Sequence, residues 1–123
     1  AGLPEARADH AQILVDMSAK FIEIASEYHD HEGNPIQIRI GIHSGPAVSG
    51  VIGKSKFAFD VWGDTINTAA RLEGNGEPGK IHISQRTFDL LDKKSSFDVR
   101  SQSISMKGKG VMQTILIGPA VRQ

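Results

Sequence analysis

The stretch at residues 57–73, FAFDVWGDTINTAARLE, holds the side chains of this chain that are best placed to do chemistry together. Asp60 stands inside a run of aromatic and aliphatic residues, where an unpaired carboxylate would be costly, so we expect it to have a designated partner. Asn67 and Arg71 are four residues apart, and on a helix both would project from the same face. An amide beside a guanidinium suits an anion, and a site that stabilises phosphate charge would be built in this way.

The elements that must position these side chains are a short strand and a helix. Residues 57–62 are predicted to form the strand. Gly63 then breaks its pattern, and Asp64 is placed to cap a helix over residues 65–73. Spacing alone leaves a plain alternative open, because a surface helix that carries an asparagine and an arginine is ordinary.

A second candidate for anion binding is the run KGKG at residues 107–110. Most runs of this kind are solvated hairpin turns. Glycine on both sides would nevertheless let the backbone approach phosphate oxygens closely, and a lysine supplies a mobile positive charge. From the residues alone, both interpretations stay open.

Three patterns that suggest other chemistry fail on their context. Residues 74–79 spell G-x-G-x-x-G, but they follow a predicted helix and precede a predicted strand, so they should stop the helix and turn the chain. Residues 53–55 lack the leading glycine of a P-loop, because position 48 is valine. His43 and His82 fall on predicted strands and could approach each other, yet no carboxylate spacing supports a metal site there.

The composition limits the classes of function. The chain has 123 residues, the size of one domain, and its formal net charge of zero argues against a nucleic-acid-binding face. Without cysteine it has no disulfide or thiolate–metal framework. No apolar run approaches the roughly 20 residues that cross a bilayer, and the N-terminus lacks a signal-peptide pattern. We therefore expect a cytoplasmic location without direct membrane contact, and a membrane anchor elsewhere in the parent protein stays compatible with this.

Hydrophobic periodicity predicts a long amphipathic helix over residues 9–30. Asp9 and Gln12 have the spacing of a capping box, and the turn-forming residues 33–35 should end the helix. The apolar face of this predicted helix comprises Leu14, Met17, Phe21, Ile24 and Tyr28.

The remaining elements predict a sheet covered by helices. A short helix is expected at residues 85–92, where Ser84 could cap it. Strands are expected at residues 36–42, 47–52, 57–62, 80–84, 97–105 and 111–117, the last two joined through Gly108 and Gly110. The interleaving of helices and strands predicts an α+β fold with helices packed on a mixed, largely antiparallel sheet.

Three segments resemble the catalytic domain of class III adenylate and guanylate cyclases. FDVWGDTINTAARLE resembles the segment that specifies the nucleotide and stabilises the transition state in that family. IRIGIHSGPAVSGVIG, at residues 38–53, resembles the strand–turn–strand before it, and MKGKGVMQTILI, at 106–117, resembles the closing hairpin. The match runs from about residue 3 to residue 118 in the family's order and spacing. The resemblance implies the ferredoxin-like palm of that family.

The resemblance also implies roles for four residues. Asp60 would accept a hydrogen bond from the adenine amino group. Asn67 would orient the ribose and the reacting groups, and Arg71 would stabilise the pentavalent phosphorus of the transition state. Lys107 would hold the terminal phosphates, with Lys109 as an alternative at this spacing.

What the matched segments lack is equally specific. In the family, two metal-binding aspartates and the lysine that pairs with the adenine-binding aspartate lie upstream of the matched region. Residues 1–123 are therefore expected to be the C-terminal portion of a cyclase catalytic domain. No residue of this chain is predicted to bind metal, and the two Mg²⁺ or Mn²⁺ ions of the complete domain would have their ligands outside it.

The implied function is a signalling enzyme that converts ATP to 3′,5′-cyclic AMP and pyrophosphate, with this fragment inactive alone. In the family the site forms between two domains, which implies a second cyclase domain as partner and a head-to-tail homodimer. The rival hypothesis is a catalytically silent cyclase-like module that dimerises or senses nucleotide. A cyclic-di-GMP synthase of related architecture is disfavoured, because no G-G-[DE]-E-F run occurs.

Overall fold

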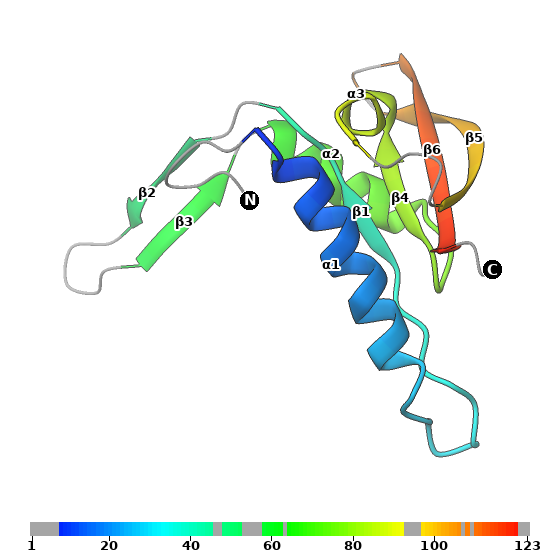
Figure 1. Ribbon diagram of the computed structural model, residues 1–123. Coiled ribbons are helices and arrows are strands. Elements are labelled where there is room, and N and C mark those ends of the chain that lie inside the picture. Colours follow the sequence, from blue (N-terminus) through cyan, green and yellow to red (C-terminus); the bar gives the residue numbers. More distant parts are fainter. Residues whose placement is uncertain are drawn as a thin grey trace.

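The computed structural model describes residues 8–45, 48–52, 58–62, 64–92, 97–106, 108 and 110–120, with the backbone alone for residues 48–52, 58–62 and 119–120. The elements in chain order are α1 (His10–Ala25), β1 (Ile40–Ile42), β2 (Val48–Ile52), β3 (Ala58–Trp62), α2 (Asp64–Gly74), β4 (Ile81–Ser84), α3 (Gln85–Asp89), β5 (Phe97–Met106) and β6 (Gly110–Ala120). Helices and strands interleave as predicted, and the α+β class is confirmed (Figure 1).

Four of the strands form one mixed sheet in the order β1-β4-β6-β5. β1 and β4 are parallel, and β4–β6 and β5–β6 are antiparallel. The parallel pair needs a long crossover, which β2, β3 and α2 provide between β1 and β4. β5 and β6 follow each other through a tight turn in which Gly108 and Gly110 have φ values of 80° and 75°, a backbone region that favours glycine. The predicted hairpin through these two glycines is confirmed.

α1 covers one face of this sheet together with α3. Because side chains alternate along a strand, the isoleucines of three neighbouring strands share that face. They are Ile40 and Ile42 of β1, Ile81 and Ile83 of β4, and Ile115 and Ile117 of β6. Ala11 and Val15 of α1 are buried against them, and the partly buried Phe88 of α3 packs against the same cluster. This apolar layer is the larger core of the molecule, and each fully buried isoleucine contributes about 1.5–3 kcal/mol.

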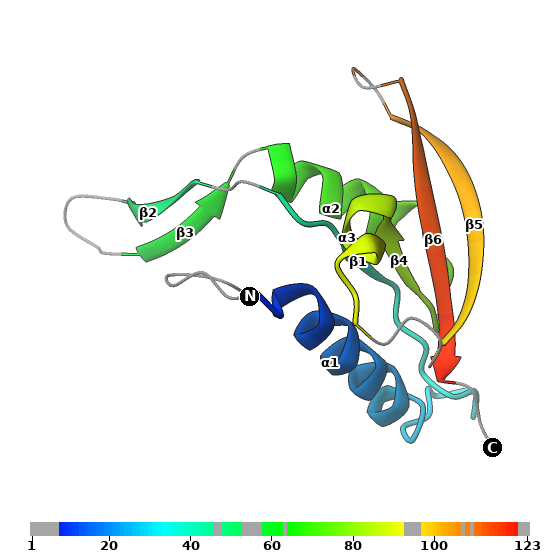
Figure 2. The ribbon, with the colours of Figure 1, turned by 45° about the horizontal axis from the view of Figure 1, so that its top comes forward.

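α2 covers the opposite face (Figure 2). The side chains between the isoleucines belong to this face, among them the fully buried His82 of β4 and Leu116 of β6. Leu72 of α2 packs there with Ile104 and Met106 of β5. This second core is smaller, and it contains polar groups.

α1 differs from its prediction in length and in its N-terminal cap. Asp9 occupies the N-cap position, but its side chain makes no capping hydrogen bond. Gln12 instead donates to Asp16 at 2.9 Å, and its Oε1 accepts from the backbone N–H of Asp92 at 2.9 Å. The predicted capping box is therefore wrong, and Gln12 joins α1 to the segment after α3.

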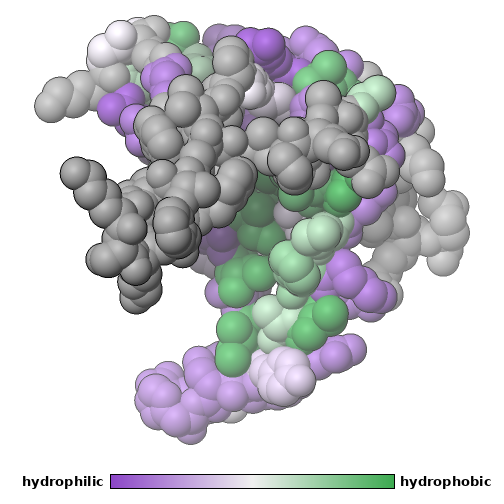
Figure 3. Space-filling view, turned by 90° about the vertical axis from the view of Figure 1, so that its left-hand side faces the viewer, coloured by the Kyte–Doolittle hydropathy of each residue, from purple (hydrophilic) through white to green (hydrophobic). Residues whose placement is uncertain are grey.

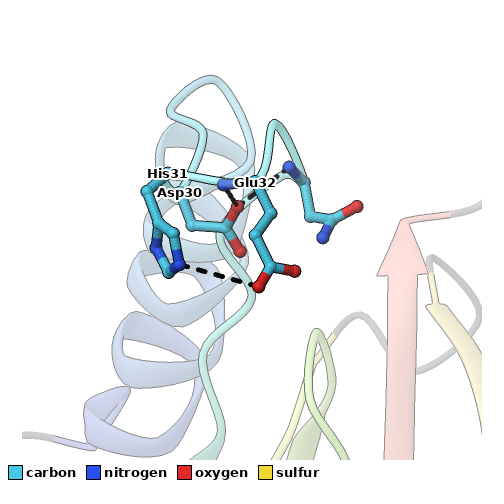
Figure 4. A network of polar contacts seen from close by, with 4 residues as sticks. Asp30, His31 and Glu32 are labelled. Atoms are coloured by element: carbon cyan, nitrogen blue, oxygen red, sulfur yellow. Dashed lines mark hydrogen bonds and ion pairs between the residues drawn. The ribbon is translucent and has the colours of Figure 1, made fainter.

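The helix ends at Ala25, and the residues predicted as its last turn fold back as a loop. The Asp30 side chain takes backbone N–H groups that a continuing helix would use, because its Oδ1 accepts from the N–H groups of Glu32 at 2.8 Å and Asn34 at 3.0 Å (Figure 4). The N–H of Ile36 then donates to the Tyr28 carbonyl at 2.9 Å. This local alternative to helical hydrogen bonding explains why the predicted helix was too long.

The predicted apolar face of α1 is only partly the buried one. Leu14 packs on the core, but Met17, Phe21, Ile24 and Tyr28 are between 43% and 62% exposed. Figure 3 shows a band of hydrophobic surface on this side of the molecule. Small residues such as Ala11 and Ser18 face the sheet instead, where they let the helix approach the isoleucines closely.

Two further predictions concern strands. Within the predicted strand 36–42, only residues 40–42 pair with a neighbouring strand, while the carbonyl of Ile38 accepts from the N–H of Gly79 at 2.8 Å. β2 and β3 pair antiparallel as a separate two-stranded hairpin, which projects from the body in Figures 1 and 2.

Candidate functional site

The predicted helix that carries Asn67 and Arg71 is confirmed as α2. Its residues Thr65, Thr68 and Leu72 are buried against the sheet, as expected for positions three and four apart. Asn67 is exposed and Arg71 is half-buried. The amide and the guanidinium therefore extend from a helix whose opposite side is anchored in the protein.

A glycine on β1 sets the distance between α2 and the sheet. A Cβ atom on Gly41 would lie 2.5 Å from the carbonyl oxygen of Ala69 and would overlap the backbone of Glu73. Only a residue without a side chain allows this approach of helix and strand. Arg71 lies between those two contact points in the chain, so β1 fixes the backbone from which it extends.

The C-terminal carbonyls of α2 also have specific partners. The last four carbonyls of a helix lack intrahelical donors. Arg71 O accepts from the side chain of Asn75 at 2.8 Å, and Glu73 O accepts from the N–H of Gly76 at 3.1 Å. Leu72 O accepts from Nδ1 of the buried His82 at 2.8 Å. The predicted helix stop at residues 74–79 is confirmed, and His82 fastens the end of α2 to the sheet.

Asp60 lies on the strand that leads directly into α2. In the β2–β3 hairpin it stands opposite Gly50, and β3 ends at Trp62, two positions before Asp64, where α2 begins. Four residues of extended chain span at most about 14 Å, so the backbone of Asp60 lies near the N-terminal end of α2. Asp64 itself is the first residue of the helix, where its negative charge is favourable.

Lys107 and Lys109 lie outside the described residues. Their neighbour Met106 is 2% exposed and belongs to the same apolar cluster as Leu72, which directly follows Arg71. The fold thus packs the end of β5 on the buried side of α2, a proximity that the sequence did not reveal.

The described residues do not form a metal centre. Among them, no group of three or more His, Asp or Glu side chains is arranged to hold a metal ion. His43 and His82, weighed as ligands from their strands, have other partners: Nδ1 of His43 bonds to the Ser84 hydroxyl at 2.7 Å, and Nε2 of His82 bonds to the Thr114 hydroxyl at 2.8 Å.

Sequence reasoning missed the groups that hold α2 in place. Gly41 interrupts an alternating isoleucine strand, and a glycine at such a position signals close backbone approach. His82 gave no such signal, because the donor that fastens Leu72 O is ten positions away along the chain.

Comparison with known proteins gives a consistent result. The family model for the adenylate and guanylate cyclase catalytic domain matches residues 1–118. An adenylate cyclase of Mycobacterium tuberculosis is 40% identical over 122 residues, which are 98% of this chain and 27% of that protein. The chain therefore spans about a quarter of the length of this relative.

Solved structures give the same fold. The guanylate cyclase domain of RhGC from Catenaria anguillulae, in complex with GTP, superposes with a TM-score of 0.85 at 36% identity, covering 98% of this chain and 65% of that one. The catalytic core of a rhodopsin-guanylyl cyclase with converted specificity, in complex with ATPαS, gives 0.83 at 38% identity, covering 96% and 64%. In the described part of the chain, no helix is long and apolar enough to span a membrane.

Proposed function

The chain belongs to the family of adenylate and guanylate cyclase catalytic domains, and from that premise we propose that it is the C-terminal portion of a domain that converts ATP to 3′,5′-cyclic AMP and pyrophosphate. In this reaction the ribose 3′-oxygen attacks the α-phosphorus. The new O–P bond forms as the bond to pyrophosphate breaks, and the 3′-hydroxyl loses its proton. Catalysis of such a transfer consists mainly of positioning and charge stabilisation.

The observation that carries the proposal is the construction around α2. The helix is fixed to the sheet on one side, by Gly41 and His82, and extends Asn67 and Arg71 on the other. Rigid support of this kind is what a site needs if its donors are to meet charge that develops only in the transition state.

Each residue has a role in the proposal. Arg71 donates to the oxygens of the pentavalent phosphorus, and Asn67 orients the ribose. Asp60 accepts a hydrogen bond from the base, and Lys107 neutralises the terminal phosphates. The role of Lys107 follows from the resemblance of its segment to the closing hairpin of the family.

The proposal extends to the complete domain and its assembly. Divalent ions, Mg²⁺ or Mn²⁺, would neutralise the phosphates. The described residues offer no ligand set for such an ion, so its ligands would come from the rest of the complete domain. A second cyclase domain, most simply a second copy in a homodimer, would complete the site.

The experiment is steady-state kinetics of Arg71→Ala in the complete domain. We expect kcat to fall about 10²–10³-fold, some 3–4 kcal/mol of barrier, because the lost donor acts on the transition state. KM should change little. Arg71→Lys should restore little activity, since an ammonium cannot reproduce the planar fork of donors. Arg86→Ala, which removes an exposed arginine of α3, is the matched control. A tenfold rise in KM at constant kcat would make Arg71 a ground-state phosphate clamp.

The choice of ATP over GTP rests on Asp60. One relative is solved with GTP and another, of converted specificity, with an ATP analogue, so this fold accommodates either base. An ionised carboxylate only accepts hydrogen bonds, which suits the adenine amino group and opposes the guanine carbonyl. Asp60→Ala should therefore erode the preference for ATP by roughly 1–3 kcal/mol, measured as the ratio of kcat/KM for the two nucleotides. An unchanged ratio would remove Asp60 from the base pocket.

The rival hypothesis, a silent module that dimerises or senses nucleotide, makes a different prediction for the same preparation. It predicts that the complete wild-type domain binds ATP without forming cyclic nucleotide in the presence of Mn²⁺. Retention of Asn67 and Arg71, the two residues proposed for the chemistry, favours the enzyme.

A further inference from the structure

Four polar side chains form a connected group where the parallel strands β1 and β4 end. His43 and Ser44 follow β1, Ser84 ends β4, and Thr87 lies in α3. The three hydroxyl residues are 6%, 2% and 0% exposed in that order, so this is a buried network. Its contacts are His43 Nδ1 to Ser84 Oγ at 2.7 Å, Ser84 Oγ to Thr87 Oγ1 at 3.0 Å, and Thr87 Oγ1 to Ser44 Oγ at 3.1 Å.

Counting hydrogens gives this network one direction. Thr87 donates its single hydroxyl hydrogen to Ser44. Ser84 must then donate to Thr87, and its own oxygen already accepts from the N–H of Thr87 at 3.3 Å. Since the Ser84 hydrogen is engaged, the contact with His43 requires a donor on the ring, so Nδ1 carries a hydrogen. The donated hydrogen bonds therefore run in one direction, from His43 through Ser84 and Thr87 to Ser44.

This hydrogen-bond network ends at Ser44, beside the first turn of α2. Ser44 is followed by Gly45, where a Cβ atom would lie 2.7 Å from the hydroxyl oxygen of Thr65. Thr65 is buried and stands two residues before Asn67. The network therefore fixes the backbone against which the N-terminal turn of α2 rests, as Gly41 and His82 fix the remainder of that helix.

We propose that the directed chain from His43 to Ser44 is a positioning device for α2, and that Thr87 is the residue on which it depends. This rests on the proposed function, because the consequence of losing the chain is a displaced Asn67 and Arg71. A small displacement of aligned groups is enough to slow a reaction that depends on orientation. None of the four residues needs to touch substrate.

The kinetic test makes the same substitution, threonine to valine, at two buried positions of the complete domain. Thr87→Val removes the hydroxyl that joins Ser84 to Ser44, and it should lower kcat about 10-fold with KM within about twofold of wild type. Thr87→Ser should restore kcat, since it restores the hydroxyl. Thr68→Val is the matched control: Thr68 is 1% exposed and its hydroxyl has no hydrogen-bond partner among the described residues, so kcat should stay at the wild-type value.

The second measurement does not depend on activity. In long-range ¹H–¹⁵N NMR spectra of the complete domain at alkaline pH, the signal missing in His43→Gln identifies His43, and wild type should show the Nδ1–H tautomer. An Nε2–H tautomer of His43 would overturn the proposed direction of these hydrogen bonds, whatever kcat the Thr87 variants have.

The kinetic outcomes separate the two proposals. Wild-type turnover with an unchanged kcat in a folded Thr87→Val domain overturns the positioning role and leaves the proposed function standing. An absence of turnover in the wild-type domain would overturn the proposed function. The tautomer of His43 would then decide on its own whether the directed hydrogen-bond network exists.

Discussion

The two faces of the four-stranded sheet are packed by different means. Under α1 the contacts are almost wholly apolar, isoleucine against small and branched residues. Under α2 they are directional or very close: His82 bonds to a helix carbonyl, Gly41 meets helix backbone, and Gly45 meets Thr65. Apolar burial stabilises a helix without fixing its register sharply, because the attraction depends on area rather than direction. The face with hydrogen bonds and backbone contacts supports the helix that carries the proposed chemistry.

The largest expected effect comes from adding a side chain where β1 and α2 are in close contact. In Gly41→Ala the added methyl group would meet backbone atoms that cannot rotate away, so α2 must move. We expect the free energy of unfolding to fall by about 3 kcal/mol, at the upper end for overpacking, together with a loss of kcat. Gly74→Ala is the control, since its Cβ would meet no atom of the described residues beyond its own turn of the helix within 4 Å. A Gly41→Ala domain with normal stability and kcat would show that close approach does not set the position of α2.

The next effect comes from the hydrogen bond that ends α2. His82→Leu leaves the Leu72 carbonyl without this buried donor, which should cost about 1–3 kcal/mol in chemical denaturation. Combining it with Thr114→Val should cost less than the sum of the single changes, because the two side chains share a hydrogen bond. His31→Ala is the comparison at an exposed histidine, where the contact with Glu32 contributes little. Additive effects would show that the hydrogen bond between His82 and Thr114 contributes nothing to stability.

A smaller effect is expected on the apolar face. Ile83→Val removes one methylene from a side chain that is 0% exposed, and should cost about 0.5–1.5 kcal/mol. Its kcat should equal that of wild type, because the α1 face is not proposed to align α2. This contrast between stability and kcat tests the comparison directly. A kcat that falls in step with stability would show that both faces position the site.

The smallest effect is expected within the α2 face itself. Among the described residues, Thr68 Oγ1 is the buried side-chain polar atom that lacks a hydrogen-bond partner. Replacing it with the isosteric valine breaks no bond and removes a buried polar group. Thr68→Val should therefore change the free energy of unfolding by no more than about 0.5 kcal/mol, or raise it. A clear loss of stability would reveal a partner for this hydroxyl.

Local patterns predicted most elements, because alternation and helix stops depend on neighbouring residues. β3, α2 and the β5–β6 hairpin lie where the sequence places them. The long first helix was the failure: Asp30 captures backbone N–H groups nearby, and the face buried on the isoleucines was not the stripe of large side chains. Periodicity shows that a helix is apolar along a line, but when apolar residues surround most of its circumference the sheet selects the face.

For the site, the sequence by itself supplied the residues proposed here for phosphate and base, Asp60, Asn67 and Arg71, and predicted that they lie on a strand and a helix in succession. The tertiary structure alone decided what holds that helix. Gly41, His82 and the network ending at Ser44 reach α2 from positions far along the chain, and only the parallel pairing of β1 with β4 brings them together. Residue types and spacing reveal chemistry within one element, whereas the support of an element comes from contacts between distant segments, which depend on the completed fold.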